Sequence, residues 1–279
     1  MAKFVNAVWP MLMLALHLSA PNFALAAPQA PVTPAIWREP STGMAFVALP
    51  KGCFQMGSTA KALDSINHVV KRLGRSMIDD ERPRHEVCVD AFFMGQTEVR
   101  ASDWLKVMGE NPPAGSGEAP AGGVRFDAAQ EFARRLTALA NGQHKFRLPT
   151  EAEWEYACHA GNKQETQPFD GERIEGAWYS TVDRRIPQPA AIAKFPANAW
   201  GLHDMLGNVW EWVADGYQAD GYAKHGLYNP LQKEAKNGER VIRGGSHRSE
   251  YMQVRCANRG SYPASETLNE IGLRLVRQP

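Results

Sequence analysis

Residues 198–212 read Asn-Ala-Trp-Gly-Leu-His-Asp-Met-Leu-Gly-Asn-Val-Trp-Glu-Trp. This stretch decides the fold because it combines turn formers with three tryptophans and two carboxylates. Gly201, Gly207, Asn198 and Asn208 permit backbone turns that other residues resist. Neither a helix nor a strand can run through the whole stretch, so the chain folds back on itself here.

The two carboxylates of this stretch, Asp204 and Glu211, predict a small calcium-binding loop. Calcium prefers oxygen ligands, and the turn from Gly207 to Val209 would expose carbonyl oxygens that complete its coordination shell. In a structural alternative, Asp204 caps a turn and Glu211 pairs with a surface base. The residues alone favour this alternative.

The N-terminal segment, residues 1–26, has the pattern of a secretory signal peptide. Lys3 precedes an apolar run over 8–18, and the segment closes on Ala-Leu-Ala at 24–26. The run is too short to span a bilayer comfortably, so a retained anchor is the weaker interpretation. Export to the periplasm is therefore expected, with cleavage near Ala26.

The remaining chain divides into a tether rich in proline and alanine over 27–42 and one domain over 43–279. No later segment predicts a membrane span. The formal net charge is +1, and loss of Lys3 with the signal peptide leaves a neutral mature chain. The absence of a block of basic residues argues against a nucleic-acid partner on electrostatic grounds. The oligomeric state cannot be read from the sequence.

Four cysteines are present: Cys53, Cys88, Cys158 and Cys256. In an oxidising compartment this even number predicts two disulfides. Cys53 and Cys88 lie in strand-like segments, which favours a cross-strand bridge and leaves Cys158 and Cys256 for the other. No cysteine or histidine spacing fits zinc.

Local patterns predict several short elements. Thr150 and Glu153 form a capping box for a helix over 151–158, and apolar spacing predicts a helix over 60–74, whose relation to any site is open. The acidic triplet 79–81 is expected to be a solvated loop, and Glu98 and Glu155 are interpreted as structural. The other expected elements are a hairpin of 46–49 with 54–56, a strand over 86–93, a helix over 103–108 capped by Ser102, and a helix capped by Asp127.

Several motifs together resemble the formylglycine-generating enzyme family, also called the sulfatase-modifying factor family. The resemblance covers about residues 43–277. Its motifs are 52–57, 90–99, Arg-Leu-Pro-Thr-Glu-Ala-Glu-Trp-Glu-Tyr-Ala at 147–157, 198–212, Arg-Val-Ile-Arg-Gly-Gly-Ser at 240–246, Arg-Cys-Ala at 255–257 and Gly-Leu-Arg at 272–274. The resemblance implies a single α+β domain with little regular secondary structure, distantly similar to C-type lectins.

The resemblance also implies one structural calcium ion. Its ligands would be the side chains of Asp204 and Glu211 and the carbonyls of Gly207 and Val209. A second calcium site of the family, near Trp178, is not expected because the loop after it is shortened. The family disulfide falls on Cys158 and Cys256.

This sequence departs from the family at the catalytic cysteines. Enzymes of the family that generate formylglycine use two cysteines after the Gly-Gly-Ser motif to bind copper(I) and activate oxygen. Here Ser249 stands near the first position, where it is assigned to substrate binding, and the region of the second is shortened. A serine hydroxyl is a poor copper(I) ligand, so no copper is expected and sulfatase activation is excluded.

One exported branch of the family lacks those cysteines and oxidises the fluorophore of the siderophore pyoverdine in the periplasm. The resemblance to that branch implies oxidation of a small peptide-derived substrate. In this hypothesis Glu250 is the general base, His247 and Arg248 hold the substrate, and Tyr251 or Trp210 stacks on its aromatic ring. Molecular oxygen, a diffusible quinone and a copper ion held by histidines remain open as oxidant, although the eight histidines show no ligand spacing that would favour copper.

Two alternatives stay open. The residues from His247 to Glu250 can form a salt-bridged loop with no catalytic role. The domain can also be a non-catalytic periplasmic binding or accessory module, for example beside nitrite reductase. No Gly-x-Gly-x-x-Gly or P-loop motif is present, which argues against a tightly held nucleotide.

Overall fold

The computed structural model describes residues 35–60, 62–63, 79–161, 177–179 and 188–279. All of these belong to one compact unit, Thr33–Pro279. The predicted signal peptide, most of the predicted 60–74 helix and the loop that follows Trp178 lie outside the described residues. Within them, no helix is long and apolar enough to cross a membrane.

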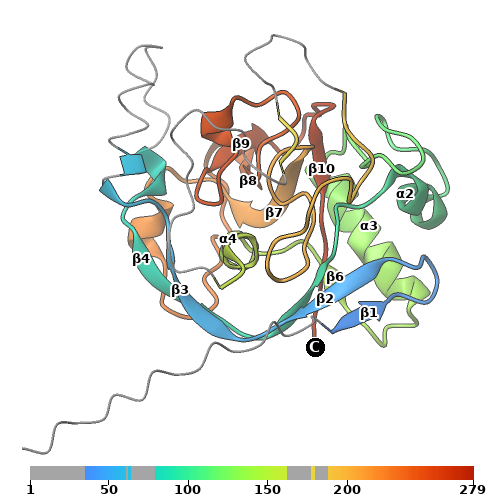
Figure 1. The fold of residues 1–279 in the computed structure, drawn as a ribbon, viewed down its shortest axis with the longest axis horizontal. Helices are drawn as coiled ribbons and strands as arrows, with labels where there is room; N and C mark the ends of the chain where they lie inside the picture. Colours follow the sequence, from blue (N-terminus) through green and yellow to red (C-terminus); the bar gives the residue numbers. More distant parts are fainter. Residues whose placement is uncertain (1–34, 61, 64–78, 162–176, 180–187) are drawn as a thin grey trace, which may run out of the picture. The chain divides into compact units, whose positions relative to one another are not determined.

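The first sheet joins the two ends of the domain (Figure 1). Its order is β1 (Ile36–Arg38), β2 (Ala45–Leu49), β5 (Phe92–Gly95), β11 (Val276–Arg277) and β6 (Phe146–Arg147), with antiparallel neighbours throughout. Trp37 pairs with Phe46 across β1 and β2. The ordered fold therefore begins before residue 43, and the tether predicted over 27–42 is too long at its C-terminal end.

The predicted hairpin of 46–49 with 54–56 is wrong in its pairing. β2 pairs with β1 and β5, whereas β3 (Gly52–Met56) pairs with β4 (His85–Val89). The strand predicted over 86–93 is likewise two strands, β4 and β5. The segments 45–56 and 85–95 thus run antiparallel to each other along their length, interrupted after β2 at Pro50, which cannot donate a ladder hydrogen bond.

Both predicted disulfides are confirmed. Cys53 lies directly opposite Cys88 in the β3–β4 pair, and these two are bonded. Cys158, near the end of α4 (Glu151–His159), is bonded to Cys256 in the loop after β8 (Glu239–Arg243). All four thiols are therefore committed to bridges, which fits an extracytoplasmic location.

The second sheet positions the candidate site. Its order is β10 (Ile271–Leu273), β7 (Trp210–Gly216), β8 and β9 (Gly260–Pro263). β7 runs parallel to β10 and antiparallel to β8. The start of β7, the end of β8 and the start of β10 consequently lie at the same edge of this sheet.

Three α-helices are described: α2 (Ala101–Met108), α3 (Phe126–Leu139) and α4. The capping box of α4 is confirmed, because Thr150 Oγ1 accepts from Glu153 N at 3.1 Å and Glu153 Oε2 accepts from Thr150 N at 2.8 Å. The expected caps of the other two helices are wrong. α2 and α3 begin before Ser102 and Asp127, and neither N-terminus has a side-chain cap.

The apolar core forms two adjoining clusters. In the first, Trp104 stacks on Phe132 with ring centroids 5.3 Å apart, which joins α2 to α3. In the second, fully buried Trp154 anchors α4, which contacts strands β3, β4, β7 and β8. α4 therefore connects the β3–β4 pair to the second sheet.

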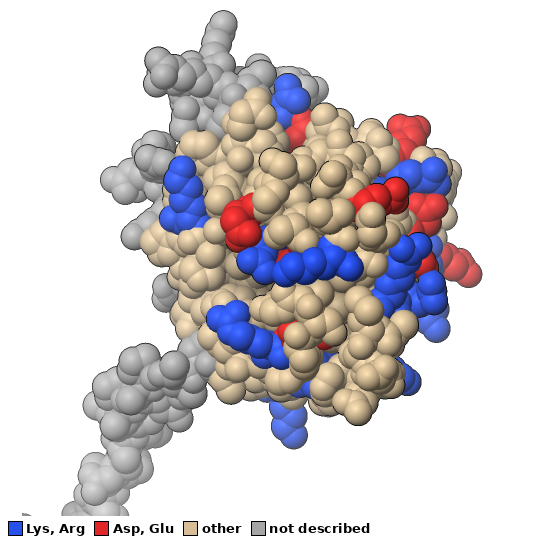
Figure 2. Space-filling model, turned by 90° about the vertical axis from the view of Figure 1, so that its right-hand side faces the viewer, with Lys and Arg blue, Asp and Glu red and all other residues tan. Residues whose placement is uncertain are grey.

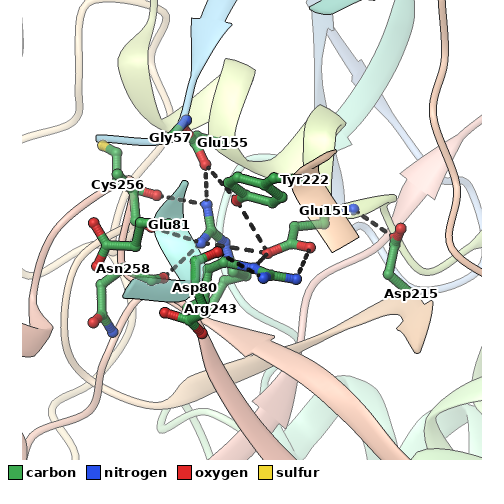
Figure 3. A network of polar contacts seen from close by, with 12 residues as sticks. Gly57, Asp80, Glu81, Glu151, Glu155, Asp215, Tyr222, Arg243, Cys256 and Asn258 are labelled. Atoms are coloured by element: carbon green, nitrogen blue, oxygen red, sulfur yellow. Dashed lines mark hydrogen bonds and ion pairs between the residues drawn. The ribbon is translucent and has the colours of Figure 1, made fainter. Parts of the chain in front are cut away.

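A network of buried charges surrounds α4 (Figure 3). Glu155 and Glu151 both point toward Arg243, and Glu151 also pairs with Arg259 at 2.7 Å. Glu81 is fully buried and binds the guanidinium of Arg255. The prediction that 79–81 is a solvated loop is therefore wrong for Glu81, which the distant Arg255 holds in the interior, whereas Asp79 is exposed.

Surface charge is mixed. On the face shown in Figure 2, basic and acidic side chains both occur. Several exposed arginines have acidic partners, among them Arg134 with Glu131 at 2.6 Å and Arg125 with Asp127 at 2.8 Å. Neighbouring charges of opposite sign reduce the field that this surface presents to a polyanion.

Candidate functional site

Three segments meet at the edge of the second sheet described above. They are the turn 204–209 before β7, the loop 244–254 after β8, and Glu270, the residue before β10. Backbone hydrogen bonds join them: Gly207 N donates to Gly244 O at 2.9 Å, and Trp210 N donates to Glu270 O at 2.7 Å. Residues far apart in sequence therefore form one local arrangement.

The turn 204–209 has an unusual backbone. Asp204, Gly207 and Asn208 all have positive φ, of 55°, 88° and 57° respectively. A Cβ at Gly207 would lie 2.1 Å from the carbonyl oxygen of Trp178, so only glycine fits there. The local sequence thus forces the reversal that its glycine and asparagine content predicts.

The turn lies beside a buried acidic cluster. Asp204, Glu211 and Glu98 are each at most 4% exposed, and Arg274 is fully buried among them. Burial, followed by the negative charges of Asp204 and Glu211, raises the pKa of Glu98 well above its ordinary value. Burial also raises the pKa of Asp204. When all three are ionised, these carboxylates exceed the single positive charge of Arg274, and burial opposes that ionised state.

This cluster fits a hard cation in donor type and in charge. Among the described residues, no group of three His, Cys, Asp or Glu side chains is arranged to hold a metal, so a cation here would also need backbone carbonyls such as those of Gly207 and Val209. Glu211 is shared, because it also accepts from Arg274 Nη2 at 2.8 Å and from Trp154 Nε1 at 2.7 Å.

His247 is buried and has a fixed orientation. Its backbone N and its ring Nδ1 both contact the carbonyl oxygen of Asn208, at 2.7 and 2.8 Å. A carbonyl only accepts, so Nδ1 carries the proton and the Nε2 lone pair of a neutral ring is free to accept. Burial lowers the pKa of His247, which favours the neutral ring.

Arg248 pairs with a carboxylate that the sequence did not indicate. Its Nη1 lies 2.6 Å from Glu270 Oε1, while half of the Arg248 side chain remains exposed. Glu270 is 6% exposed, and its second oxygen, Oε2, is buried without a hydrogen-bond partner among the residues that the structure describes. The only signal for Glu270 is its position two residues before the Gly-Leu-Arg motif.

The other predicted site residues do not point to one place. Ser249 is buried, and its Oγ accepts from Ser246 N at 3.0 Å. Glu250 is exposed and forms a capping box with Gln253 for the short helix η5 (Tyr251–Gln253). Trp210 lies in the core, 8% exposed, so little of its ring faces a substrate.

A cavity of about 360 Å³ adjoins the turn. Leu206 connects it to the loop, because this residue lines the cavity and also packs with Tyr251 against Val254. Asp204 faces the same cavity, and Cys158 brings the second disulfide to its wall. Its remaining lining residues are Pro196, Ala197, Asn198, Leu202 and Met205.

Comparison with known proteins identifies relatives of this arrangement. Residues 33–279 match the model of the sulfatase-modifying factor enzyme 1-like domain. The formylglycine-generating enzyme of Mus musculus is 31% identical over 143 residues, which are 46% of this chain and 38% of that protein. The chain thus matches less than two fifths of the length of that relative.

Two further similarities cover more of the chain. Chaperone protein LppX of Paenibacillus barcinonensis is 25% identical over 240 residues, covering 68% of this chain and 81% of that protein. The solved structure of PvdO from Pseudomonas aeruginosa aligns with a TM-score of 0.72 at 24% identity, covering 90% of this chain and all of that one. At this identity the structural match establishes the fold, which confirms the expected single α+β domain.

Proposed function

The chain belongs to the sulfatase-modifying factor enzyme 1-like domain family, and from this premise we propose that it is a periplasmic oxidative tailoring enzyme. Its substrate would be a secreted peptide natural product, namely a siderophore of the pyoverdine type whose chromophore is still in the dihydro form. The resemblance to the exported, cysteine-less branch of the family supports this substrate class.

The pairing of all four cysteines in disulfides distinguishes the proposed activity from formylglycine generation, which uses free catalytic cysteines. Each of the four cysteines is in a disulfide, and Ser249, near the position of the first catalytic cysteine, is buried against Ser246. Copper(I) requires soft ligands such as thiolates. An oxidation in this domain therefore proceeds without copper–thiolate chemistry.

The observation that carries the proposal is the arrangement of His247, Arg248 and Glu270. His247 offers a lone pair at Nε2. The guanidinium of Arg248 pairs with Glu270 through Nη1 and remains half exposed, so its other N–H groups can donate to a substrate. These two residues hold the substrate, with Ser249 beside them and Tyr251 against an aromatic ring. Glu250 takes up one proton from the substrate, and the two electrons pass with the second proton to the oxidant, which reduces molecular oxygen to hydrogen peroxide or a quinone to its quinol once the Glu250 proton is released to it.

A structural calcium ion is part of the proposal. The side chains of Asp204 and Glu211 and the carbonyls of Gly207 and Val209 would hold it. Calcium has no redox role, so it would only balance the acidic cluster and rigidify the turn. His247 binds the same turn through Asn208, so rigidity there benefits the substrate site.

A direct test incubates the purified mature protein with the dihydro-chromophore precursor and follows oxygen uptake and absorbance together. Chromophore formation with oxygen uptake identifies oxygen as the acceptor, and formation without uptake identifies another acceptor such as a quinone. The Glu250→Gln variant should slow the reaction about 100-fold, as expected for loss of a general base. Glu266→Gln, at another exposed glutamate, is the matched control. An unchanged rate in Glu250→Gln removes Glu250 from this role.

A second candidate function is a non-catalytic binding or accessory module, for example beside nitrite reductase. The Arg248–Glu270 pair and the capping role of Glu250 favour it, because both also suit a purely structural loop. The LppX relative is named a chaperone protein, which describes a binding function of the same class. Tight binding of the precursor without chromophore formation under oxygen or an added quinone would support this alternative.

A further inference from the structure

Glu98 lies beside the turn 204–209, called the calcium turn below because it carries the proposed calcium ligands. Glu98 contacts this turn at two points. This side chain is 1% exposed. It lies in the loop that follows β5 of the first sheet, more than a hundred residues before the turn. Its Oε2 accepts from Asn208 Nδ2 at 2.7 Å, and its Oε1 accepts from Val209 N at 3.1 Å. Glu98 therefore fixes both the side chain of Asn208 and the peptide that follows it.

The same peptide fixes His247. Its N–H belongs to Val209 and binds Glu98, whereas its C=O belongs to Asn208 and accepts from His247 N and Nδ1. A peptide unit is planar, so rotating the N–H away from Glu98 also rotates the C=O away from His247. The Asn208 side chain resists this rotation further, because its Oδ1 accepts from Ala190 N at 2.9 Å.

The next carbonyl along the chain, that of Val209, belongs to the predicted cation ligands. One short turn therefore places Asn208 C=O against His247 and Val209 N–H against Glu98, and Val209 C=O, the proposed cation ligand, follows directly. Arg274 is the guanidinium that faces Glu98, Asp204 and Glu211, so a divalent cation would balance their remaining charge.

We propose that Glu98 is a positioning residue that couples the calcium turn to His247 through the Asn208–Val209 peptide. This inference rests on the proposed function only in giving His247 a role toward substrate. Glu98 itself touches neither the substrate nor the cation. Its loss should disturb two properties at once: the affinity for calcium and the tautomer of the His247 ring.

The test compares the wild type with Glu98→Gln and a matched control, Glu39→Gln. Glutamine at 98 can accept from Asn208 or from Val209, but its amide nitrogen meets a second donor. Glu39 is equally buried, but it binds the backbone and hydroxyl of Thr42 in the β1–β2 turn. Both variants remove a buried carboxylate, and only one of them adjoins the site.

Two readouts are used. Calorimetry with calcium chloride should show affinity at least tenfold weaker in Glu98→Gln and within twofold of wild type in Glu39→Gln, the range typical for residues behind metal ligands. Nitrogen-15 spectra of the histidine rings, with calcium present, should show His247 protonated only at Nδ1 in the wild type and the control. Glu98→Gln should show a mixture of tautomers.

Retention of either property in Glu98→Gln overturns the proposal, as does the absence of calcium binding by the wild type. If Glu98→Gln does not fold, Asn208→Gly removes the same side-chain contact while keeping the positive φ of 57° accessible. Neither readout uses a substrate. A wild type that fails to oxidise the siderophore precursor therefore refutes the proposed function and leaves this result unaffected.

Discussion

At the scale of single residues, Gly207 shows how a close backbone contact constrains the site. Its φ is 88°, and a Cβ would lie 2.1 Å from Trp178 O. Gly109 has nearly the same φ, 81°, but a Cβ there would meet no atom within 4 Å. Comparing substitutions at the two glycines therefore distinguishes the loss of stability due to backbone strain from the loss due to a steric clash.

Gly207→Ala should destabilise the protein by about 3 kcal/mol or more, and Gly109→Ala by only about 1 kcal/mol. The difference arises because both alanines are strained by a positive φ, but only Ala at 207 must displace the Trp178 peptide. Urea unfolding of the two variants and the wild type measures it. Equal destabilisation would show that the turn and residue 178 separate freely.

Asp80 is a second residue whose environment makes a measurable prediction. Burial raises its pKa from 3.8 to about 6, although Arg259 and the hydroxyl of Tyr217 oppose this shift. The folded state thus holds the Asp80 proton more tightly than the unfolded chain does. Its stabilising contribution is complete below pH about 4 and is lost as the pH rises to about 6.

Asp80→Asn should remove this loss, because the amide stays neutral and its oxygen can still accept from Tyr217. The variant should therefore gain about 1–3 kcal/mol of unfolding free energy relative to wild type between pH 4 and pH 7. Asp215, whose pKa is raised to about 7 mainly by burial, is present in both proteins and cancels in the difference. Parallel pH profiles of the two proteins would contradict the prediction.

At the scale of elements, α4 depends on a cap that α2 lacks. Thr150→Ala removes the Oγ1 that accepts from Glu153 N and should cost about 1 kcal/mol in unfolding free energy. Ser102→Ala is the matched control, since Ser102 lies inside α2 and the N-cap position there is Arg100. This control should change stability by less than about 0.5 kcal/mol. Equal costs would show that Ser102 caps α2 in solution.

The same contrast explains which elements the sequence predicts. The helix over 151–158 is predictable because its capping box is a local pattern of residues three apart. The pairing of β2 with β5, instead of with β3, is a choice between distant partners, and no local pattern encodes it. The acidic triplet 79–81 was misread for the same reason, because Arg255 and Arg259 lie far along the chain.

The candidate site divides in the same way. The reversal at 204–209 follows from glycine and asparagine within the stretch itself, so the sequence indicates it. Glu98 and Glu270 reach the turn and the loop from other elements, and their roles depend on the parallel register of β7 with β10 and on buried contacts. Glu250, which the sequence favours as base, also caps a short helix in this structure, and this capping role cannot be read from the sequence motif alone.

At the scale of the whole molecule, buried charge joins segments that the sheets leave separate. Arg255 and Arg259 connect the loop after β8 to the 79–81 segment and to α4, and the Cys158–Cys256 bridge crosses the same region. Removing one partner of a buried ion pair leaves the other charge buried without compensation. This costs more free energy than the intact pair contributes to stability. This network therefore specifies how the parts fit and also makes each member hard to replace.

The acidic cluster of Glu98, Asp204 and Glu211 differs from that network, because Arg274 is the one arginine or lysine among the described residues that pairs with its carboxylates. A cation that binds only the folded state stabilises it by about 2.7 kcal/mol at a free concentration 100 times its Kd. For a domain of this size that corresponds to a rise in Tm of about 5–10 °C.

Calcium chloride should therefore raise the Tm of the wild type, and an excess of EGTA should reverse the rise. Asp204→Ala removes one predicted ligand and should abolish the response, whereas Asp127→Ala, at an exposed position on α3, should retain it. A wild-type Tm that is the same in calcium and in EGTA would show that the cluster's charge is balanced by protonation instead.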